Sequence, residues 1–264
     1  MNHQTKWKSF LEELIDPKSL DTSTIISKKT LAPGLWDRGK MQYEVRETAE
    51  RIANDFFNSL DLENTPIKDI ILTGSTATYN WSDMSDFDLH ILIDFNNLQN
   101  RDLMEDYFKE KTKSWNGTHN ILIKGFEVEL YIQDSNEPHV ANGIYSLMED
   151  RWLKRPTNYK LNIDHKLVKE KAANLMDDID DAYDLYAEKE YLLAKDAADA
   201  LMLKIKRYRK SGLESGGIYS VENLVFKVLR RNEYLKKLSS IKTLAYDASM
   251  SLFEREGNFI TYKK

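Results

Sequence analysis

The 264-residue sequence contains no cysteine, and this absence limits what can hold the fold together. Without cysteine there is no disulfide framework and no thiolate ligand for a structural metal. A chain that relies on neither fits a reducing compartment, so we expect a cytoplasmic protein. The fold must instead come from an apolar core, and this length suffices for one or two domains with such a core.

Long apolar runs are also missing. A membrane-spanning helix needs about 20 consecutive apolar residues, and no stretch of the sequence supplies them. The first 20 residues carry Lys6, Lys8, Glu12 and Glu13 among their apolar positions. This pattern fits neither a signal peptide nor a membrane span, so we expect no membrane partner.

The sequence also has no surplus of positive charge. It contains 38 Lys and Arg and 43 Asp and Glu, which gives a net charge of −5. This negative net charge argues against an extended nucleic-acid-binding surface. Charge is nevertheless clustered locally. An acidic stretch at residues 177–184 precedes a basic cluster of Lys204, Lys206, Arg207, Arg209 and Lys210. These clusters either balance each other as solvated helix faces or provide cations for an anionic ligand.

Residues 70–95 carry the most informative pattern that is present. A short apolar run ends at Gly74 and Ser75, which predict a turn. Such a turn offers backbone N–H groups and a hydroxyl to a phosphate, above all where a helix follows. Gly74 and Ser75 are therefore candidate nucleotide-binding residues.

After a ten-residue spacer, apolar and polar side chains alternate strictly over residues 86–91. Period-two alternation predicts a half-buried strand with Asp86, Asp88 and His90 on its polar face. Two carboxylates on one strand face repel each other unless they stand in open water or bind a cation. Hard oxygen ligands suit Mg²⁺, so the Asp pair is a candidate metal site.

The turn, the spacer and Asp86-Phe87-Asp88-Leu89 together resemble the signature of the DNA-polymerase-beta-like nucleotidyltransferases. A closer resemblance, which includes Tyr79-Asn80-Trp81-Ser82 and Asp88-Leu89-His90, is to uncharacterised proteins of this superfamily in tailed bacteriophages. The superfamily signature covers roughly residues 67–133, and the phage likeness extends on both sides. If the chain is phage-encoded, its compartment is the host cytoplasm.

The resemblance implies an enzyme that transfers a nucleoside monophosphate from a nucleoside triphosphate, such as ATP, to a hydroxyl. It also implies two Mg²⁺ ions at Asp86 and Asp88. The acceptor is not legible from the sequence, and relatives use RNA ends, proteins or small molecules. The alternative is a catalytically silent binding or inhibitor module of phage origin that retains the fold. The intact Asp-x-Asp pattern favours the enzyme.

The resemblance further implies a third carboxylate on a neighbouring strand. Glu129 between two apolar residues matches it best, although the superfamily more often has Asp there, and Glu127 is the competing register. His90 and Glu127 are additional candidates for substrate contact. His90 would act in proton transfer near neutral pH or only shield the strand end. On charge alone, Lys204, Arg207 and Arg209 are assigned to the leaving pyrophosphate.

The expected fold is α+β, with a small mixed β-sheet and flanking helices at residues 1–158 and a helical domain at 159–264. The sequence predicts strands at residues 67–72, 86–95, 119–123, 126–133, 144–148 and 151–154. It predicts helices at residues 7–15, 36–60, 76–81, 98–114, 167–190, 191–209, 220–238 and 241–253. It also predicts a turn at Asn116-Gly117 and a flexible loop from Gly212 to Gly217.

Overall fold

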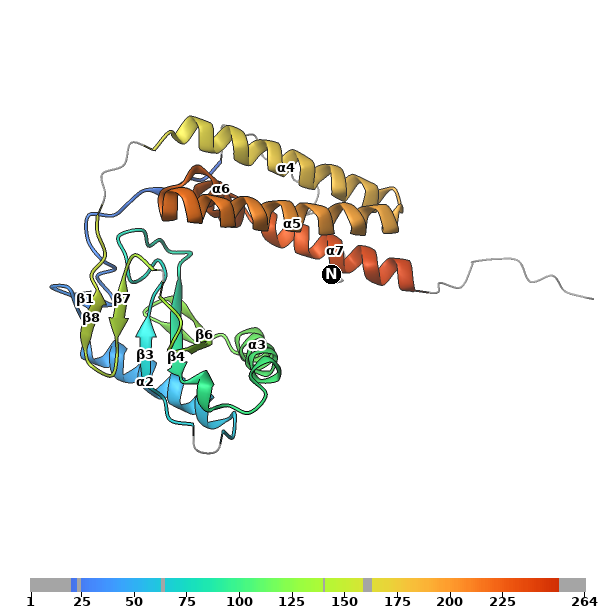
Figure 1. Ribbon diagram of the computed structural model, residues 1–264. Helices are drawn as coiled ribbons and strands as arrows, with labels where there is room; N and C mark the ends of the chain where they lie inside the picture. Colours follow the sequence, from blue (N-terminus) through green and yellow to red (C-terminus); the bar gives the residue numbers. More distant parts are fainter. Residues whose placement is uncertain (1–19, 23–24, 63–64, 140, 159–162, 252–264) are drawn as a thin grey trace, which may run out of the picture. The chain divides into compact units, whose positions relative to one another are not determined.

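The computed structural model describes residues 20–22, 25–62, 65–139, 141–158 and 163–251 (Figure 1). The chain forms two compact units, a sheet unit of Ser23–Asn162 and a helical unit of Ile163–Lys264 with Met1–Thr22. The predicted helix at residues 7–15 lies outside the described residues. The predicted domain boundary after residue 158 borders positions 159–162, which also lie outside them, and it stays a prediction.

The sheet unit contains a six-stranded mixed sheet. In spatial order its strands are β5 (Leu122–Ile123), β6 (Phe126–Asp134), β4 (Asp86–Ile93), β3 (Asp69–Leu72), β7 (Ile144–Ser146) and β8 (Arg151–Lys154). The neighbouring strands β4 and β6 are parallel, and every other neighbouring pair is antiparallel. The predicted α+β fold with a small mixed sheet is confirmed.

Helices α2 (Tyr43–Asn58) and α3 (Arg101–Thr118) pack against the apolar core on one face of this sheet. Strand β4 turns Phe87, Leu89 and Ile91 toward that core, where all three are fully buried. Because side chains alternate along a strand, Asp86 and Asp88 must then lie on the opposite face. The core therefore decides which face carries the carboxylates.

The predicted helix at residues 36–60 is wrong at its start. Strands β1 (Trp36–Asp37) and β2 (Lys40–Met41) form a hairpin there, and α2 begins only at Tyr43. Arg38 and Gly39 at the hairpin tip have positive φ angles, which a helix does not allow. Trp36 stacks on Trp152 with ring centroids 4.6 Å apart, and this contact stabilises the hairpin.

The predicted turn at Asn116-Gly117 is also wrong, because α3 continues to Thr118. The Asn116 side chain accepts a hydrogen bond from the Leu130 N–H at 3.0 Å and donates to the Leu130 carbonyl at 3.1 Å. These two bonds tie the helix to β6. An Asn side chain that would otherwise favour a turn is thereby used in a tertiary contact.

The helical unit contains α4 (His165–Ala187), α5 (Tyr191–Gly216), the short 3₁₀ helix η4 (Gly217–Tyr219), α6 (Val221–Arg231) and α7 (Tyr234–Met250). The predicted flexible loop from Gly212 is wrong, because α5 runs through Gly212 to Gly216. The predicted helix at residues 220–238 is broken at Glu233, which has a φ of 64°. Ser220 caps the start of α6, where its hydroxyl accepts a hydrogen bond from the Asn223 N–H at 3.3 Å.

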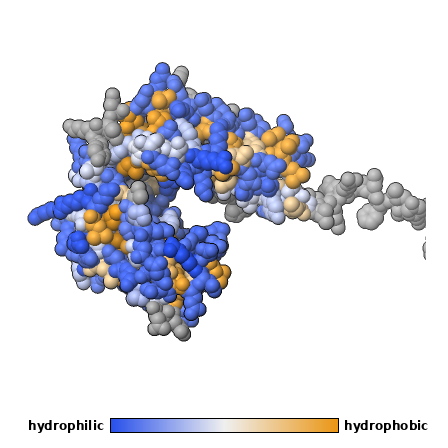
Figure 2. Space-filling model, viewed as in Figure 1, coloured by the Kyte–Doolittle hydropathy of each residue, from blue (hydrophilic) through white to orange (hydrophobic). Residues whose placement is uncertain are grey.

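Hydrophilic residues cover most of the face that each unit shows in Figure 2, with apolar residues in scattered groups. Exposed large apolar side chains include Leu192, Leu193 and Leu203 on α5. Single exposed apolar side chains are normal on protein surfaces. Among the helices of the described residues, none has the length together with the low polarity that spanning a bilayer requires.

Candidate metal centre

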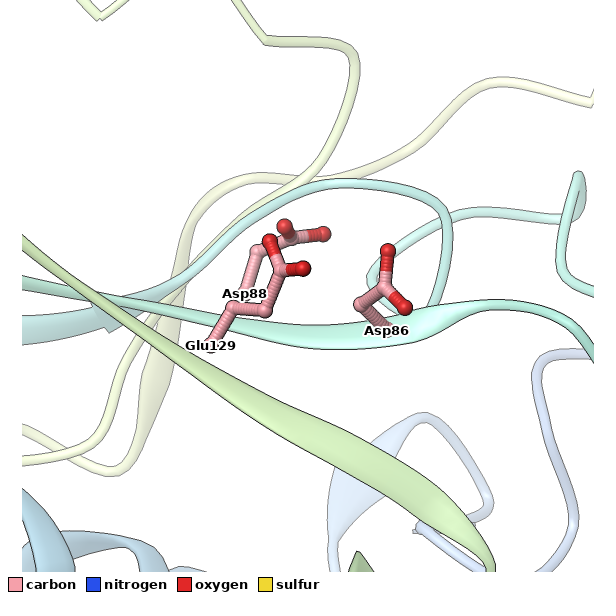
Figure 3. A group of neighbouring side chains, drawn as sticks. All are labelled: Asp86, Asp88 and Glu129. Atoms are coloured by element: carbon pink, nitrogen blue, oxygen red, sulfur yellow. The ribbon is translucent and has the colours of Figure 1, made fainter. Parts of the chain in front are cut away.

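The parallel pairing of β4 with β6 brings three carboxylates together. Asp88 lies opposite Glu129 in this register, and Asp86 lies opposite Glu127. One carboxylate oxygen from each of Asp86, Asp88 and Glu129 lies within 4.8 Å of the other two, and all three residues are half-buried. Figure 3 shows the three side chains on the same side of the two strands.

Glu127, the competing third carboxylate, is exposed, and the three-carboxylate group does not include it. Glu127 precedes Glu129 by two residues on β6 and lies opposite Asp86 rather than Asp88. The closeness of the Glu129 carboxylate to those of Asp86 and Asp88 therefore favours Glu129 over the exposed Glu127. Substrate contact by Glu127 stays a prediction.

The donor set fits a hard divalent cation. Mg²⁺ prefers hard oxygen ligands such as carboxylates. One oxygen from each of Asp86, Asp88 and Glu129 lies within 4.8 Å of the other two, so these three residues would hold such a cation.

Gly74 lies directly against this centre. Its φ of +71° is a backbone conformation that L side chains rarely adopt. A Cβ atom at this position would stand 1.8 Å from Oδ2 of Asp88. The neighbouring Thr73 N–H donates to the Asp88 carbonyl at 3.1 Å. Only glycine therefore allows the turn to approach the carboxylate so closely.

The segment that follows Gly74 is a series of turns, so the predicted helix at residues 76–81 is wrong. The Thr78 N–H donates to the Ser75 carbonyl at 3.0 Å, and the Thr78 hydroxyl donates to the same carbonyl at 2.9 Å. The Thr76 hydroxyl donates to the Asp86 carbonyl at 3.2 Å. Threonine hydroxyls that bond the backbone locally compete with helix formation. The Thr76 bond also ties the turn to the start of β4 at Asp86.

Ser75 is also held in place. Its hydroxyl donates to the Ser85 hydroxyl at 2.7 Å, and the Ser85 oxygen also accepts from the Ser82 N–H at 2.9 Å. Ser85 is buried one residue before Asp86. This network links the predicted phosphate-binding turn to the first carboxylate, and nothing in the sequence pattern had singled out Ser85.

His90 lies beyond Asp88 on the same strand face. Burial lowers its pKa to about 4, against the opposing effect of a hydrogen bond with Gln133, so the ring is neutral at pH 7. Its Nδ1 lies 3.0 Å from Oε1 of Gln133, and its ring stacks on Tyr131 with centroids 4.8 Å apart. These contacts describe a packed side chain. Substrate contact by His90 stays a prediction.

Tyr131 is the functional candidate that the sequence did not single out. Its hydroxyl donates to Oε2 of Glu129. Burial raises the pKa of the Tyr131 phenol, as do the hydrogen bond to Glu129 and the negative charges of Glu129, Asp88 and Asp86. The alternation had placed Tyr131 on the carboxylate face. The hydrogen bond from Tyr131 to Glu129 depends on side-chain torsions, which the alternation of apolar and polar residues does not predict.

The predicted pyrophosphate ligands lie on α5 in the helical unit. Lys204 pairs with Asp178 at 2.7 Å, as the charge-balance interpretation expects. The Arg209 guanidinium stands 4.0 Å from the Phe226 ring centroid and donates to Asn223 at 3.2 Å. Arg207 is exposed. A role for these three residues toward a nucleotide stays a prediction.

Comparison with known proteins adds little to this geometry. No protein-family model and no curated protein matches the chain. One solved structure that it resembles is titled "Structure of STING-associated CdnE c-di-GMP synthase from Capnocytophaga granulosa", with 16% sequence identity and 94% of each chain covered. The TM-score is 0.20, so the two backbones superimpose poorly. The interpretation of the site therefore rests on this chain's own residues.

Proposed function

We propose that this chain is a Mg²⁺-dependent nucleotidyltransferase that moves a nucleoside monophosphate from a nucleoside triphosphate to an acceptor hydroxyl. The observation that carries the proposal is the group of Asp86, Asp88 and Glu129, with oxygens within 4.8 Å and Gly74 directly beside it. A phosphate-binding turn next to clustered carboxylates is the donor set that a metal-bound triphosphate requires.

In this reaction the acceptor oxygen forms a bond to the α-phosphorus, and the bond from that phosphorus to the bridging oxygen of the β-phosphate breaks. The acceptor proton leaves to a base, and pyrophosphate is released. Mg²⁺ held by the carboxylates would lower the pKa of the acceptor hydroxyl and neutralise charge on the phosphates.

The protein residues have separate parts in this proposal. Asp86, Asp88 and Glu129 hold the metal, and Glu129 also serves as a candidate proton acceptor. Gly74 and Ser75 bind the β- and γ-phosphates through backbone N–H groups, and the Ser75 hydroxyl reaches a phosphate oxygen by releasing Ser85. Because the Thr76 hydroxyl donates to the Asp86 carbonyl, the backbone of the turn is already held beside the carboxylates before binding.

The test is Mg²⁺-dependent release of pyrophosphate, or transfer of label from each of the four α-labelled nucleoside triphosphates. A thermal shift with each triphosphate and Mg²⁺ shows first which base is bound. Asp86→Asn and Asp88→Asn should abolish transfer while the protein stays folded. Asp106→Asn is the matched control, because this exposed carboxylate on α3 only pairs with Lys109.

Activity that survives in both Asp86→Asn and Asp88→Asn would overturn the enzyme proposal. Saturable triphosphate binding without any turnover would instead identify the chain as a silent binding module. Metal removal with a chelator gives an independent check, since it should abolish transfer in the unsubstituted protein and excess Mg²⁺ should restore it.

A further inference from the structure

We propose that Tyr131 is a positioning residue that orients Glu129 for the metal, an inference that rests on the proposed function. The two residues stand two apart on β6, so their side chains lie on the same face of the strand. The Tyr131 hydroxyl donates a hydrogen bond to Oε2 of Glu129. Glu129 in turn lies opposite Asp88 on β4.

Packing from the neighbouring strand holds the phenol in place. Tyr131 is paired with His90 in the β4–β6 register, and their rings stack with centroids 4.8 Å apart and planes 24° apart. The His90 ring is itself fixed by Gln133, whose Oε1 lies 3.0 Å from Nδ1. The hydroxyl that reaches Glu129 therefore belongs to a ring with little freedom to move.

A hydrogen bond of this kind matters because the last torsion of a glutamate side chain is broad and has no sharp preference. An unsupported Glu129 would lose that freedom on binding a metal. The phenol restricts the carboxylate beforehand and uses only one of its lone pairs, so the others can bind a cation. Hydrogen-bond partners of metal ligands typically contribute about 10–100-fold to metal affinity.

The experiment measures Mn²⁺ affinity in the full-length chain by electron paramagnetic resonance of free Mn²⁺, since carboxylate sites accept Mn²⁺ and Mg²⁺ alike. Tyr131→Phe removes only the hydroxyl and should weaken Mn²⁺ binding about 10-fold or more with little change in Tm. Tyr107→Phe is the matched control. Its hydroxyl donates to the Leu60 carbonyl at 3.2 Å and not to any of the three carboxylates, so Mn²⁺ affinity should not change.

A double-substitution cycle separates positioning from general packing. Glu129→Ala should weaken Mn²⁺ binding, and adding Tyr131→Phe to it should weaken binding no further, because the group that Tyr131 orients is gone. An effect of Tyr131→Phe that persists in the Glu129→Ala background would overturn the positioning role.

Two other outcomes are equally informative. Weaker binding in Glu129→Ala but normal binding in Tyr131→Phe would refute the inference and leave the proposed function standing. No saturable Mn²⁺ binding in the unsubstituted chain would refute the proposed function, and the positioning role with it.

Discussion

Gly74 combines a backbone conformation that favours glycine with a close approach to Asp88 of the candidate metal site. Gly74→Ala would place a methyl group 1.8 Å from Oδ2 of Asp88 in a backbone with a φ of +71°. We expect loss of Mn²⁺ binding and of transfer, because the turn or the carboxylate must move. We also expect a loss of more than about 1 kcal/mol in the free energy of unfolding, from the positive φ alone.

Gly39→Ala is the control for that substitution. Gly39 also has a positive φ, of +81°, but no atom lies within 4 Å of the added Cβ. Urea unfolding should show the cost of a positive φ in both variants and a larger total loss in Gly74→Ala, whereas only Gly74→Ala should lose Mn²⁺ binding. Equal Mn²⁺ affinity in the two variants would mean that the contact between Gly74 and Asp88 has no role in the site.

Glu129 and Glu127 provide a second test among single residues. Glu129→Gln should lower transfer by orders of magnitude, because it removes the carboxylate that lies opposite Asp88. Glu127→Gln changes an exposed side chain outside the carboxylate group and should change the rate little. Single-turnover rates with saturating Mg²⁺ separate the two. The reverse ranking would assign the third carboxylate to Glu127.

Among the elements, the end of β6 is tied to the start of α3 by a buried carboxylate. Asp134 is only 2% exposed, accepts hydrogen bonds from the N–H groups of Asn136 and Phe95, and pairs with Arg101 at 3.1 Å. Burial by itself would raise the pKa of Asp134. The hydrogen bonds and the Arg101 charge outweigh burial and hold the pKa below its usual value.

A lowered pKa in the folded state makes this contribution depend on pH. The stabilisation is present above the unfolded pKa of about 3.9 and is lost as the pH falls through the lower folded value. Asp134→Asn should therefore cost about 1–3 kcal/mol at pH 7, and the difference from the unsubstituted protein should shrink below about pH 4. Urea unfolding between pH 7 and pH 3 checks this. Asp106→Asn, at an exposed carboxylate, should show no such difference.

At Gly212, the contact between α5 and α6 and the helix propensity of alanine have opposite effects on stability. Alanine in place of glycine inside a helix normally stabilises by roughly 0.5–1 kcal/mol. A Cβ on Gly212 would, however, stand 2.4 Å from Cβ of Glu222 and 2.7 Å from Oγ of Ser220. Gly212→Ala should therefore destabilise the protein by about 1–3 kcal/mol, because a close helix contact is overpacked.

Gly117→Ala in α3 is the matched control, since no atom lies within 4 Å of its added Cβ. It should leave the free energy of unfolding unchanged or raise it. Both variants are compared by urea unfolding at pH 7. A Gly212→Ala protein as stable as the unsubstituted one would argue against the close packing of α5 on the start of α6.

For the molecule as a whole, the question is whether the helical unit takes part in binding the nucleotide. Arg207→Gln tests this better than a change at Arg209, because Arg209 also packs on Phe226. If Arg207 reaches the triphosphate, calorimetry should show weaker binding, with a larger loss at low salt where charges are least screened. Lys166→Gln, whose side chain is 86% exposed on α4, is the control. Unchanged triphosphate affinity in Arg207→Gln would mean that the helical unit serves packing or acceptor binding instead.

The sequence by itself determined the local features of this protein. The alternation from residue 86 placed Phe87 and Leu89 in the core and Asp86 and Asp88 on the other face, because a strand has a period of two whatever its neighbours are. The same reasoning identified the β5–β6 hairpin, whose two turn residues Lys124 and Gly125 both have positive φ angles.

Only the tertiary structure decided which distant residues meet. Asn116 became helical because its amide pairs with Leu130, and Gly212 stays inside α5 close to the start of α6. The approach of Gly74 to Asp88 and the bond from Tyr131 to Glu129 depend on strand order and side-chain torsions. The physical reason is that periodicity reports only which face a residue occupies. Contacts between elements depend on register and packing, which local preferences do not encode.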